Sequence, residues 1–268
     1  MIKSYLNYIP ERQNKPRKKG VNMMMDKGLS IREVEDFLST SGIYTDFAKL
    51  GFGTSMVMNE KDVIQKIELY KSAKIKVYFG GTLFEAFIIR DKFDEYRKMA
   101  DKFKVDAIEV SDGSIIMEHE DKCKYIEKLA KSHIILSEVG SKEAGIITAP
   151  NKWIQMMNDE INAGSSFVIA EARESGTVGI YRPNGNAHVA LVNKIVSKVE
   201  RDKILWEAPL KSQQVWFIKT LGSDVNLGNI ASNEIIPLET LRLGLRGDTF
   251  FQFLPDEFQN LRIKPKVK

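Results

Sequence analysis

The sequence predicts an α/β fold and, within that class, a single-domain (β/α)8 TIM barrel. Three observations support this prediction: a length of 268 residues, eight apolar strand-like runs, and helix-like stretches that alternate with those runs. One strand and its helix together occupy about 21–36 residues, which is the length that such a unit needs. The rival is a doubly wound open sheet, which usually carries G-x-G-x-x-G after its first strand, whereas this chain reads MDKGLS there.

The predicted strands are rich in Val, Ile, Leu and Phe, and most do not alternate strictly between apolar and polar residues. This composition is typical of parallel strands that are covered on both faces. The predicted strands are residues 20–26, 44–53, 75–81, 106–113, 132–140, 165–172, 203–209 and 224–230.

The predicted helices repeat apolar residues at the three- and four-residue spacing of one helical face. The first begins at Ser30, a favourable N-cap residue, and places Ile31, Val34, Phe37 and Leu38 on one side. The predicted helices are residues 30–39, 59–73, 93–103, 118–131, 152–162, 187–199, 212–221 and 234–243.

Charge divides the chain into three predicted segments: a basic N-terminal arm at 1–19, the barrel at 20–254 and a basic C-terminal tail at 255–268. The net charge of +4 comes from 40 Lys and Arg against 36 Asp and Glu, and the positive excess lies at the two ends. We interpret these ends as solvated segments. The alternative is a nucleic-acid-binding arm, but the ends lack a basic motif interleaved with aromatic residues, and the barrel segment is acidic. We therefore expect no nucleic-acid partner.

The cellular location is predicted from three features of the sequence: its short apolar runs, its N-terminus and its single cysteine. The apolar runs are too short to span a membrane, and the N-terminus lacks the apolar stretch of a secretory signal. Cys123 is the only cysteine, which excludes an intrachain disulfide, and we interpret it as a packing residue. These features predict a cytoplasmic protein with no membrane partner.

Four successive predicted strands carry a glutamate near their carboxyl ends, in IEVSDG, SEVGSK, AEARES and WEAPLK. These residues are Glu109, Glu138, Glu171 and Glu207, and Asp26 ends the first strand. In a parallel barrel all these strand ends meet at one rim, where barrel enzymes keep their chemistry. Clustered carboxylates repel one another and need a cation, and oxygen ligands suit Mg²⁺. Each single acid has an alternative interpretation as an ordinary polar residue paired with a lysine, but four in register favour a metal site.

Cationic residues are interspersed with these acids at the same strand ends. They are Lys49, Lys142, Arg173 and Lys211. Side chains of this charge would hold an anion beside the metal. Glu174 lies one step further from its strand, and we interpret it as a structural partner.

Small and polar residues around two strands are candidates for binding a phosphate group. Gly80, Gly81 and Thr82 follow the third strand, and Asn226 and Asn229 belong to the eighth. Backbone N–H groups of such loops bind phosphate in many barrel enzymes. The alternative is a set of tight turns, where glycine is common because it accepts unusual backbone angles.

Nine ordered motifs resemble the phosphosulfolactate synthase family and together cover about residues 15–251 of the sequence. The motifs are KPRKKGVNMMMDKGL, YTDFAKLGFGTS, GGTLFE, IEVSDG, SEVGSK, EARESG, WEAPLKSQQ, VNLGNI and LETLRLGLRGDTF. The resemblance implies a (β/α)8 barrel that adds sulfite to phosphoenolpyruvate in a Mg²⁺-dependent step, giving (2R)-phospho-3-sulfolactate. It further implies a carbon–sulfur lyase, a homo-oligomer, and a product that opens coenzyme M synthesis in methanogens.

The resemblance also implies roles for single residues. Lys142, in SEVGSK, matches the family lysine proposed as the general acid that protonates C2 of the substrate. Lys49, Arg173 and Lys211 would bind sulfite, carboxylate and phosphate. The residues that would hold or orient Mg²⁺ are Glu109, Glu138 and Glu171, with Asp26 and Glu207 as further candidates. A plant heat-stress-associated protein resembles the same family, so the alternative function is a non-catalytic protein on the same barrel.

Overall fold

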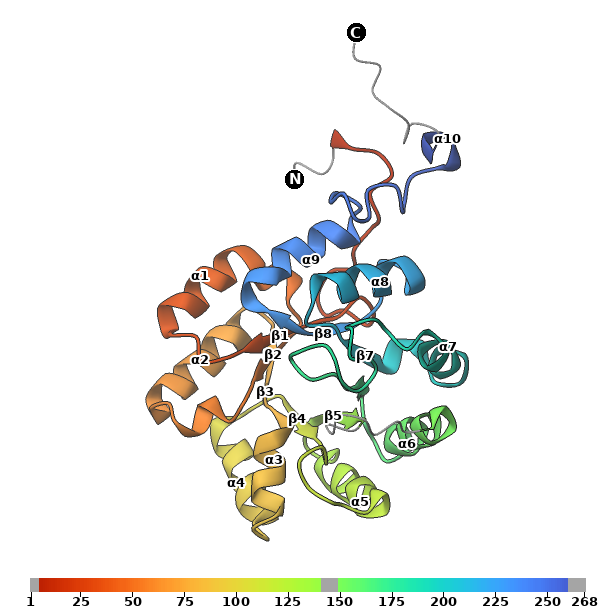
Figure 1. The fold of residues 1–268 in the computed structure, drawn as a ribbon. Helices are drawn as coiled ribbons and strands as arrows, with labels where there is room; N and C mark the ends of the chain where they lie inside the picture. Colours follow the sequence, from red (N-terminus) through yellow and green to blue (C-terminus); the bar gives the residue numbers. More distant parts are fainter. Residues whose placement is uncertain (1–4, 141–148, 260–268) are drawn as a thin grey trace.

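Eight parallel strands form a nearly closed barrel in the computed structural model, which describes residues 5–140 and 149–259 (Figure 1). The hydrogen-bonded order is β3-β2-β1-β8-β7-β6-β5-β4, and every neighbouring pair runs parallel. The strands are β1 Asn22–Asp26, β2 Phe47–Leu50, β3 Lys76–Phe79, β4 Ala107–Val110, β5 Ile134–Val139, β6 Phe167–Ala170, β7 Ile204–Glu207 and β8 Leu227–Ala231. The predicted fold class and all eight predicted strands are therefore confirmed.

Helices surround the barrel and connect successive strands (Figure 1). They are α1 Ile31–Ser41, α2 Glu60–Ser72, α3 Gly81–Ile88, α4 Phe93–Phe103, α5 His119–Leu129, α6 Pro150–Asn162, α7 Val189–Lys198, α8 Lys211–Leu221, α9 Ile235–Arg242 and α10 Asp256–Gln259. All eight predicted helices are present within a few residues of their expected bounds. The sequence pattern missed α3, because its N-cap is Gly80 and its first residue is Gly81, a pair that we expected to form a loop.

The barrel closes between β3 and β4 without a strand ladder, and the residue before β4 makes the connection. The Asp106 backbone N–H donates to the Val77 carbonyl at 3.0 Å, and the Asp106 carboxylate accepts from the Val77 N–H at 3.0 Å. A side chain thus replaces the missing ladder partner, so these two backbone groups remain hydrogen-bonded.

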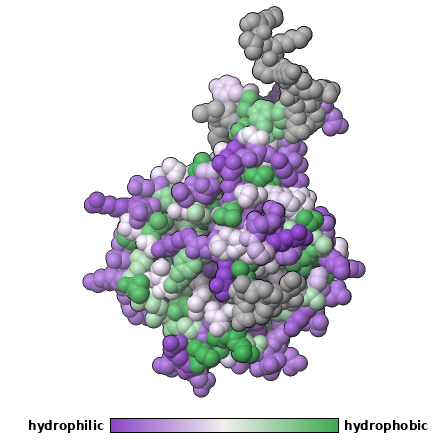
Figure 2. All heavy atoms as spheres, viewed as in Figure 1, coloured by the Kyte–Doolittle hydropathy of each residue, from purple (hydrophilic) through white to green (hydrophobic). Residues whose placement is uncertain are grey.

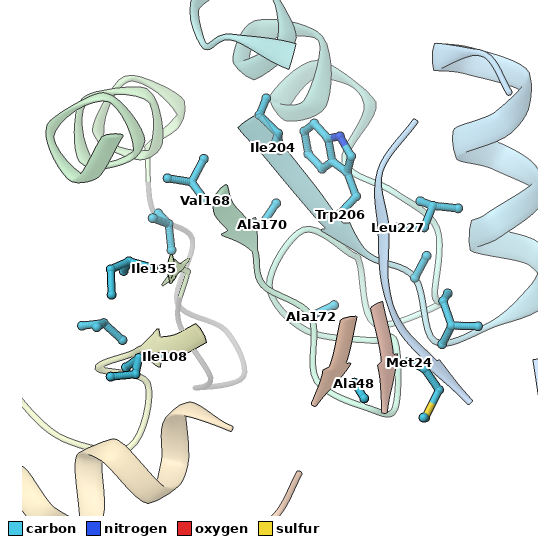
Figure 3. Close-up of a cluster of buried hydrophobic side chains, with 14 of the residues drawn as sticks. Met24, Ala48, Ile108, Ile135, Val168, Ala170, Ala172, Ile204, Trp206 and Leu227 are labelled. Atoms are coloured by element: carbon cyan, nitrogen blue, oxygen red, sulfur yellow. The ribbon is translucent and has the colours of Figure 1, made fainter. Parts of the chain in front are cut away.

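Two apolar layers hold the strands in place. The outer layer fills the space between strands and helices, and Figure 3 shows Val168, Trp206 and Leu227 within it. The inner layer packs inside the barrel and includes Met23, Phe47, Tyr78, Leu136, Ile169 and Leu205. Both layers are shielded from water, which explains why the strands read as apolar runs without strict alternation.

Inward-facing positions recur at every second residue, and along β2, β4, β5, β6 and β7 they change from apolar to charged. On β5 the inner residue Leu136 is followed by Glu138, and on β7 Leu205 is followed by Glu207. Glu138 pairs with Ile169 of β6, so these two inward-facing residues lie side by side. The inner apolar layer therefore forms a floor, and the glutamates lie above it at the carboxyl ends of the strands.

Within the N-terminal arm, the stretch from Arg12 to Arg17 packs against the opposite end of the barrel rather than extending into solvent. Arg12 donates to Glu239 at 2.9 Å and to the Gly20 carbonyl at 2.8 Å, and its side chain is only 3% exposed. Lys15 donates to the carbonyls of Gly42 and Ala73, which are the C-cap residues of α1 and α2. Cations are favourable at helix C-termini, so this contact explains part of the basic charge of the arm.

The two terminal segments meet beyond α9 and project from the barrel (Figures 1 and 2). The rings of Tyr8 and Phe258 pack edge to face with centroids 5.5 Å apart. Tyr5 and Leu6 beside them are largely exposed. Across residues 5–140 and 149–259, none of the helices combines the length and apolar character that crossing a membrane requires.

Candidate active site

A cavity of about 600 Å³ opens at the carboxyl ends of the strands. Residues from all eight strand ends or from the loops that follow them line it. Of the residues predicted from the sequence, those that line the cavity are Lys49, Gly80, Gly81, Thr82, Glu109, Glu138, Glu171, Arg173, Glu207 and Asn229. The predicted convergence of charged strand ends on one rim is thus present in the structure.

The four strand-end glutamates are all buried, with relative exposures of 1–4% for Glu109, Glu138, Glu171 and Glu207. Charged carboxylates are costly to bury unless they are paired or hydrogen-bonded. The cluster must therefore be stabilised by cations, by N–H donors or by protonation.

Lys49 supplies the cation at the floor of this cluster. Its ammonium lies 2.8 Å from Glu109 Oε1, 3.7 Å from Glu207 Oε1 and 3.8 Å from Glu138 Oε2. Burial alone would lower the pKa of Lys49, but the three carboxylates outweigh burial and raise it. Lys49 is therefore a permanent positive charge whose partners are the glutamates.

Glu109 is held from a second side by the start of α3. The Gly81 backbone N–H donates to Glu109 Oε1 at 2.6 Å, so the positive end of the helix faces a carboxylate. Burial raises the pKa of Glu109, and the Lys49 ammonium opposes that shift. The predicted glycine motif thus contacts a protein carboxylate in this structure.

Glu207 has a strongly perturbed carboxyl group. Burial, partly offset by Lys49 and reinforced by Glu138, raises the pKa of Glu207 to about 8. Its Oε2 accepts from the Ala172 N–H at 2.7 Å. A carboxyl group in this state can hold a proton near neutral pH.

Tyr78 is a cavity-floor residue that the sequence interpretation did not single out. It pairs in register with Lys49 and is fully buried. Burial raises the pKa of Tyr78 well above its ordinary value, and the nearby Glu109 and Glu207 raise it further. The sequence feature that could have identified Tyr78 is its position on β3: it lies two residues before Gly80, at an inward-facing site.

Three buried oxygen atoms that face the cavity lack a hydrogen-bond donor within the described part of the chain. They are Glu109 Oε2, Glu207 Oε1 and Asn229 Oδ1. Asn229 adopts a left-handed backbone with φ of 55° inside β8, where the register with β1 shifts. Orphaned acceptors of this kind are a sign of a missing cation or water.

These oxygens suit a Mg²⁺ ion that also binds water and substrate, but they do not form a cage of protein side chains alone. Within residues 5–140 and 149–259, no three Asp, Glu, His or Cys side chains are arranged to form a protein-only metal cage. The carboxylates converge on the Lys49 ammonium instead. Mg²⁺ commonly takes one or two carboxylates and completes its octahedron with water and substrate oxygens, and the orphaned acceptors suit that arrangement.

Three predicted site residues do not line the cavity. Asp26 is fully buried and accepts from the Gly28 and Leu29 N–H groups and the Tyr70 hydroxyl, and it pairs with Lys66 at 2.8 Å. With these partners, the Asp26 carboxylate anchors the turn after β1 rather than facing the cavity.

The other two also have structural partners. Asn226 donates to the carbonyls of Asp202 and Ile204 at the opposite end of the barrel. Lys211 pairs with Asp248 at 2.7 Å and does not line the cavity. The structure therefore favours structural roles for both residues. Lys142 lies outside the described residues.

Two charged residues that line the cavity, Lys27 and Glu174, were absent from the predicted binding set. They come from the loops after β1 and β6 and form an ion pair with each other. Glu174 matches its interpretation as a structural partner. The sequence feature that could have identified Lys27 is its position directly after Asp26, at the end of the first strand.

The eight parallel strands form a (β/α)8, or TIM-barrel, fold, and the carboxylate-lined cavity lies at the strand ends, where enzymes of this fold have their active sites. The 3-hexulose-6-phosphate synthase of Salmonella typhimurium has a similar fold, with a TM-score of 0.54 and 12% identity over 84% of this chain and 100% of that one. This likeness concerns the fold alone.

Sequence comparison is more specific. The (2R)-phospho-3-sulfolactate synthase (ComA) family matches residues 10–248. The phosphosulfolactate synthase of Methanothermobacter thermautotrophicus is 42% identical over 244 residues, 90% of this chain and 95% of that protein. That of Methanocaldococcus jannaschii is 43% identical over 238 residues, 87% of this chain and 94% of that protein. The chain belongs to the phosphosulfolactate synthase family, and its relatives are named as an enzyme.

Proposed function

We propose that this chain catalyses the Mg²⁺-dependent addition of sulfite to phosphoenolpyruvate, giving (2R)-phospho-3-sulfolactate. It is then a lyase of the carbon–sulfur type. The observation that carries the proposal is the convergence of four buried glutamates, Lys49 and Arg173 on one cavity, in a chain of this family.

The reaction joins two anions and therefore needs a site that offsets negative charge. The sulfite sulfur forms a bond to C3 of phosphoenolpyruvate, and the C2–C3 π electrons move toward the substrate carboxylate. One proton then adds to C2, which completes the saturated product. Cations and hydrogen-bond donors placed where charge develops lower the barrier of such a step.

The acidic side of the cavity suits a metal that also contacts the substrate. Glu109, Glu207 and Asn229 offer orphaned oxygens, and Glu138 and Glu171 lie in the same cavity. Bound there, Mg²⁺ would supply positive charge to the substrate carboxylate as electrons reach it. Asp26 is the least suitable of the proposed ligands because its carboxylate already has four partners.

Lys142 remains the proposed general acid. It follows β5 by three residues in the sequence. Lys49, at the cavity floor, is poorly suited as the acid because its pKa is raised, so its ammonium releases a proton less readily. A lysine close to other cations has a lowered pKa and donates a proton more readily.

The test incubates the pure full-length chain with Mg²⁺, sulfite and phosphoenolpyruvate and follows products by mass spectrometry. We expect a species that contains both a sulfonate and a phosphate group, and we expect EDTA to abolish its formation. Unchanged substrate under varied conditions would favour the non-catalytic alternative.

The general-acid role is tested by Lys142→Ala, with Lys131→Ala as a matched control because Lys131 is an exposed lysine after α5. We expect Lys142→Ala to keep its circular dichroism spectrum and lose turnover, whereas Lys131→Ala keeps both. Near-normal turnover by Lys142→Ala would refute the role.

The remaining expectations are proposals of the same kind: a cytoplasmic enzyme whose product feeds coenzyme M or sulfolactate synthesis, working as a homo-oligomer without a nucleic-acid partner. The exposed Tyr5, Leu6 and Phe250 near the projecting termini support self-association, because exposed apolar clusters often mark interfaces. Light scattering at several concentrations measures the assembly state.

A further inference from the structure

We propose that Lys27 binds the phosphate group of phosphoenolpyruvate at the mouth of the cavity, and that Glu174 holds the Lys27 ammonium until that group arrives. The proposal rests on the proposed function for the identity of the anion. It assigns a specificity-determining contact to Lys27 and explains the pairing of Glu174.

The position of Lys27 is fixed by its buried neighbour. The Asp26 carboxylate accepts from the Gly28 N–H at 2.8 Å and from the Leu29 N–H at 2.9 Å, so it closes the turn that contains Lys27. Asp26 is itself held by Tyr70 at 2.9 Å and Lys66 at 2.8 Å. The backbone of Lys27 is thus held in place while its side chain is 46% exposed at the cavity.

Lys27 and Glu174 come from non-adjacent parts of the barrel rim. Strands β8 and β7 separate β1, which precedes Lys27, from β6, which precedes Glu174. Their ion pair therefore spans the rim, and both residues line the cavity. The Lys27 ammonium also lies 5.8 Å from the centre of the Phe52 ring, another cavity residue.

Charge in the cavity is segregated by depth. The buried glutamates lie at the strand ends with Lys49, whose side chain is 8% exposed and whose ammonium is already paired with three carboxylates. Lys27 and Arg173 are the remaining cations among the described lining residues, and Arg173 is exposed. A substrate with two anionic ends would place its carboxylate toward the metal and its phosphate toward these cations.

The Lys27–Glu174 pair is suited to being exchanged. The two side chains are 46% and 56% exposed, and a solvated pair of this kind contributes only about 0–1 kcal/mol. A phosphate monoester carries more negative charge than one carboxylate and offers three acceptor oxygens. It can therefore replace Glu174 at Lys27 with little cost from breaking the pair.

The test measures steady-state kinetics with each substrate varied in turn. Losing one charge-assisted contact should raise the KM for phosphoenolpyruvate about 10–100-fold in Lys27→Met, while kcat and the KM for sulfite change by less than about threefold. Lys27→Arg keeps the charge and should retain the wild-type KM within about fivefold. Glu174→Gln removes the competing carboxylate and should lower the KM for phosphoenolpyruvate.

Lys203→Met is the matched control, because Lys203 also pairs with an exposed glutamate, Glu200, but lies before β7 at the other end of the barrel. An unchanged KM for phosphoenolpyruvate in Lys27→Met, or a rise confined to sulfite, overturns the proposal.

Calorimetric titration with phosphoenolpyruvate and Mg²⁺, in the absence of sulfite, separates this proposal from the proposed reaction. Weaker binding by Lys27→Met than by wild type and Lys203→Met supports the contact even if the chain forms no product. Equal binding by all three, or no binding by wild type, overturns it even if the chain is active.

Discussion

Single residues in the cavity show how a sheet position changes the chemistry of a side chain. Glu207 ends β7 facing inward, where water is excluded and Glu138 lies nearby, so its pKa rises from 4.5 to about 8. The folded protein then holds a proton on Glu207 at pH values where the unfolded chain has lost it. This contribution to stability is fully present below about pH 4.5 and disappears as the pH rises through about 8.

Replacing Glu207 by Gln should flatten the dependence of stability on pH. Between about pH 4.5 and pH 8 the wild-type free energy of unfolding should fall by up to about 1.4 kcal/mol per pH unit from this one group, and the variant should lack that component. Urea denaturation in EDTA at a series of pH values measures both curves. Glu200→Gln, at an exposed site, should follow the wild type, and parallel curves for Glu207→Gln and wild type would count against the buried-proton interpretation.

The sequence was sufficient to predict that the four glutamates and Lys49 share one rim, because each follows an apolar stretch of a strand and the parallel barrel brings such positions together. It failed to separate Asp26 from them. The difference depends on Lys66 and Tyr70, which lie on α2 and are distant in the sequence. No local pattern marks such a contact.

At the scale of elements, α3 shows why a glycine pair is ambiguous. Gly80 and Gly81 were candidates for phosphate binding or for a tight turn; in the structure Gly80 is the N-cap of α3, and the N–H of Gly81, its first residue, donates to Glu109. The start of α3 has no Ser, Thr, Asp or Asn at its N-cap, so the usual sequence signal was absent. A phosphate role for this motif remains a proposal.

Gly81→Ala should damage the cavity, because a Cβ at this position would lie 2.7 Å from Ser111 Cβ and 2.9 Å from Glu109 Oε1. Overpacking of this kind costs about 1–3 kcal/mol and would displace the Glu109 carboxylate. We expect a lower midpoint of thermal unfolding together with a large loss of turnover. Gly247→Ala, where a Cβ meets nothing within 4 Å, is the control, and identical behaviour of the two variants would contradict the account of α3.

The two ends of the barrel differ: one end holds the charged cavity, and the N-terminal arm packs against the other. The repeated strand-and-helix pattern was sufficient to predict the barrel. The packing of the arm was not predictable, because its basic residues find partners at Asp46, Asp224 and Glu239 through long-range contacts. A run of basic residues looks the same in sequence whether it is solvated or paired.

Arg12→Met should therefore destabilise the whole barrel. It leaves Glu239, whose side chain is 4% exposed, without its ion-pair partner, and loss of one member of a buried pair costs about 3–5 kcal/mol. Lys18→Met, at an exposed position of the same arm, should change the free energy of unfolding by less than about 0.5 kcal/mol. Equal and small effects in urea denaturation would show that the arm behaves as a solvated segment.

The central claim is that this cavity adds sulfite to C3 of phosphoenolpyruvate and delivers a proton to C2. The most direct measurement is ³¹P and ¹H NMR of the pure chain with Mg²⁺, sulfite and phosphoenolpyruvate in D₂O. The account predicts a new phosphate ester with a sulfonate-bearing C3 and a single deuterium at C2 in one configuration. A spectrum that retains only phosphoenolpyruvate, at enzyme concentrations comparable to the substrate, would contradict it.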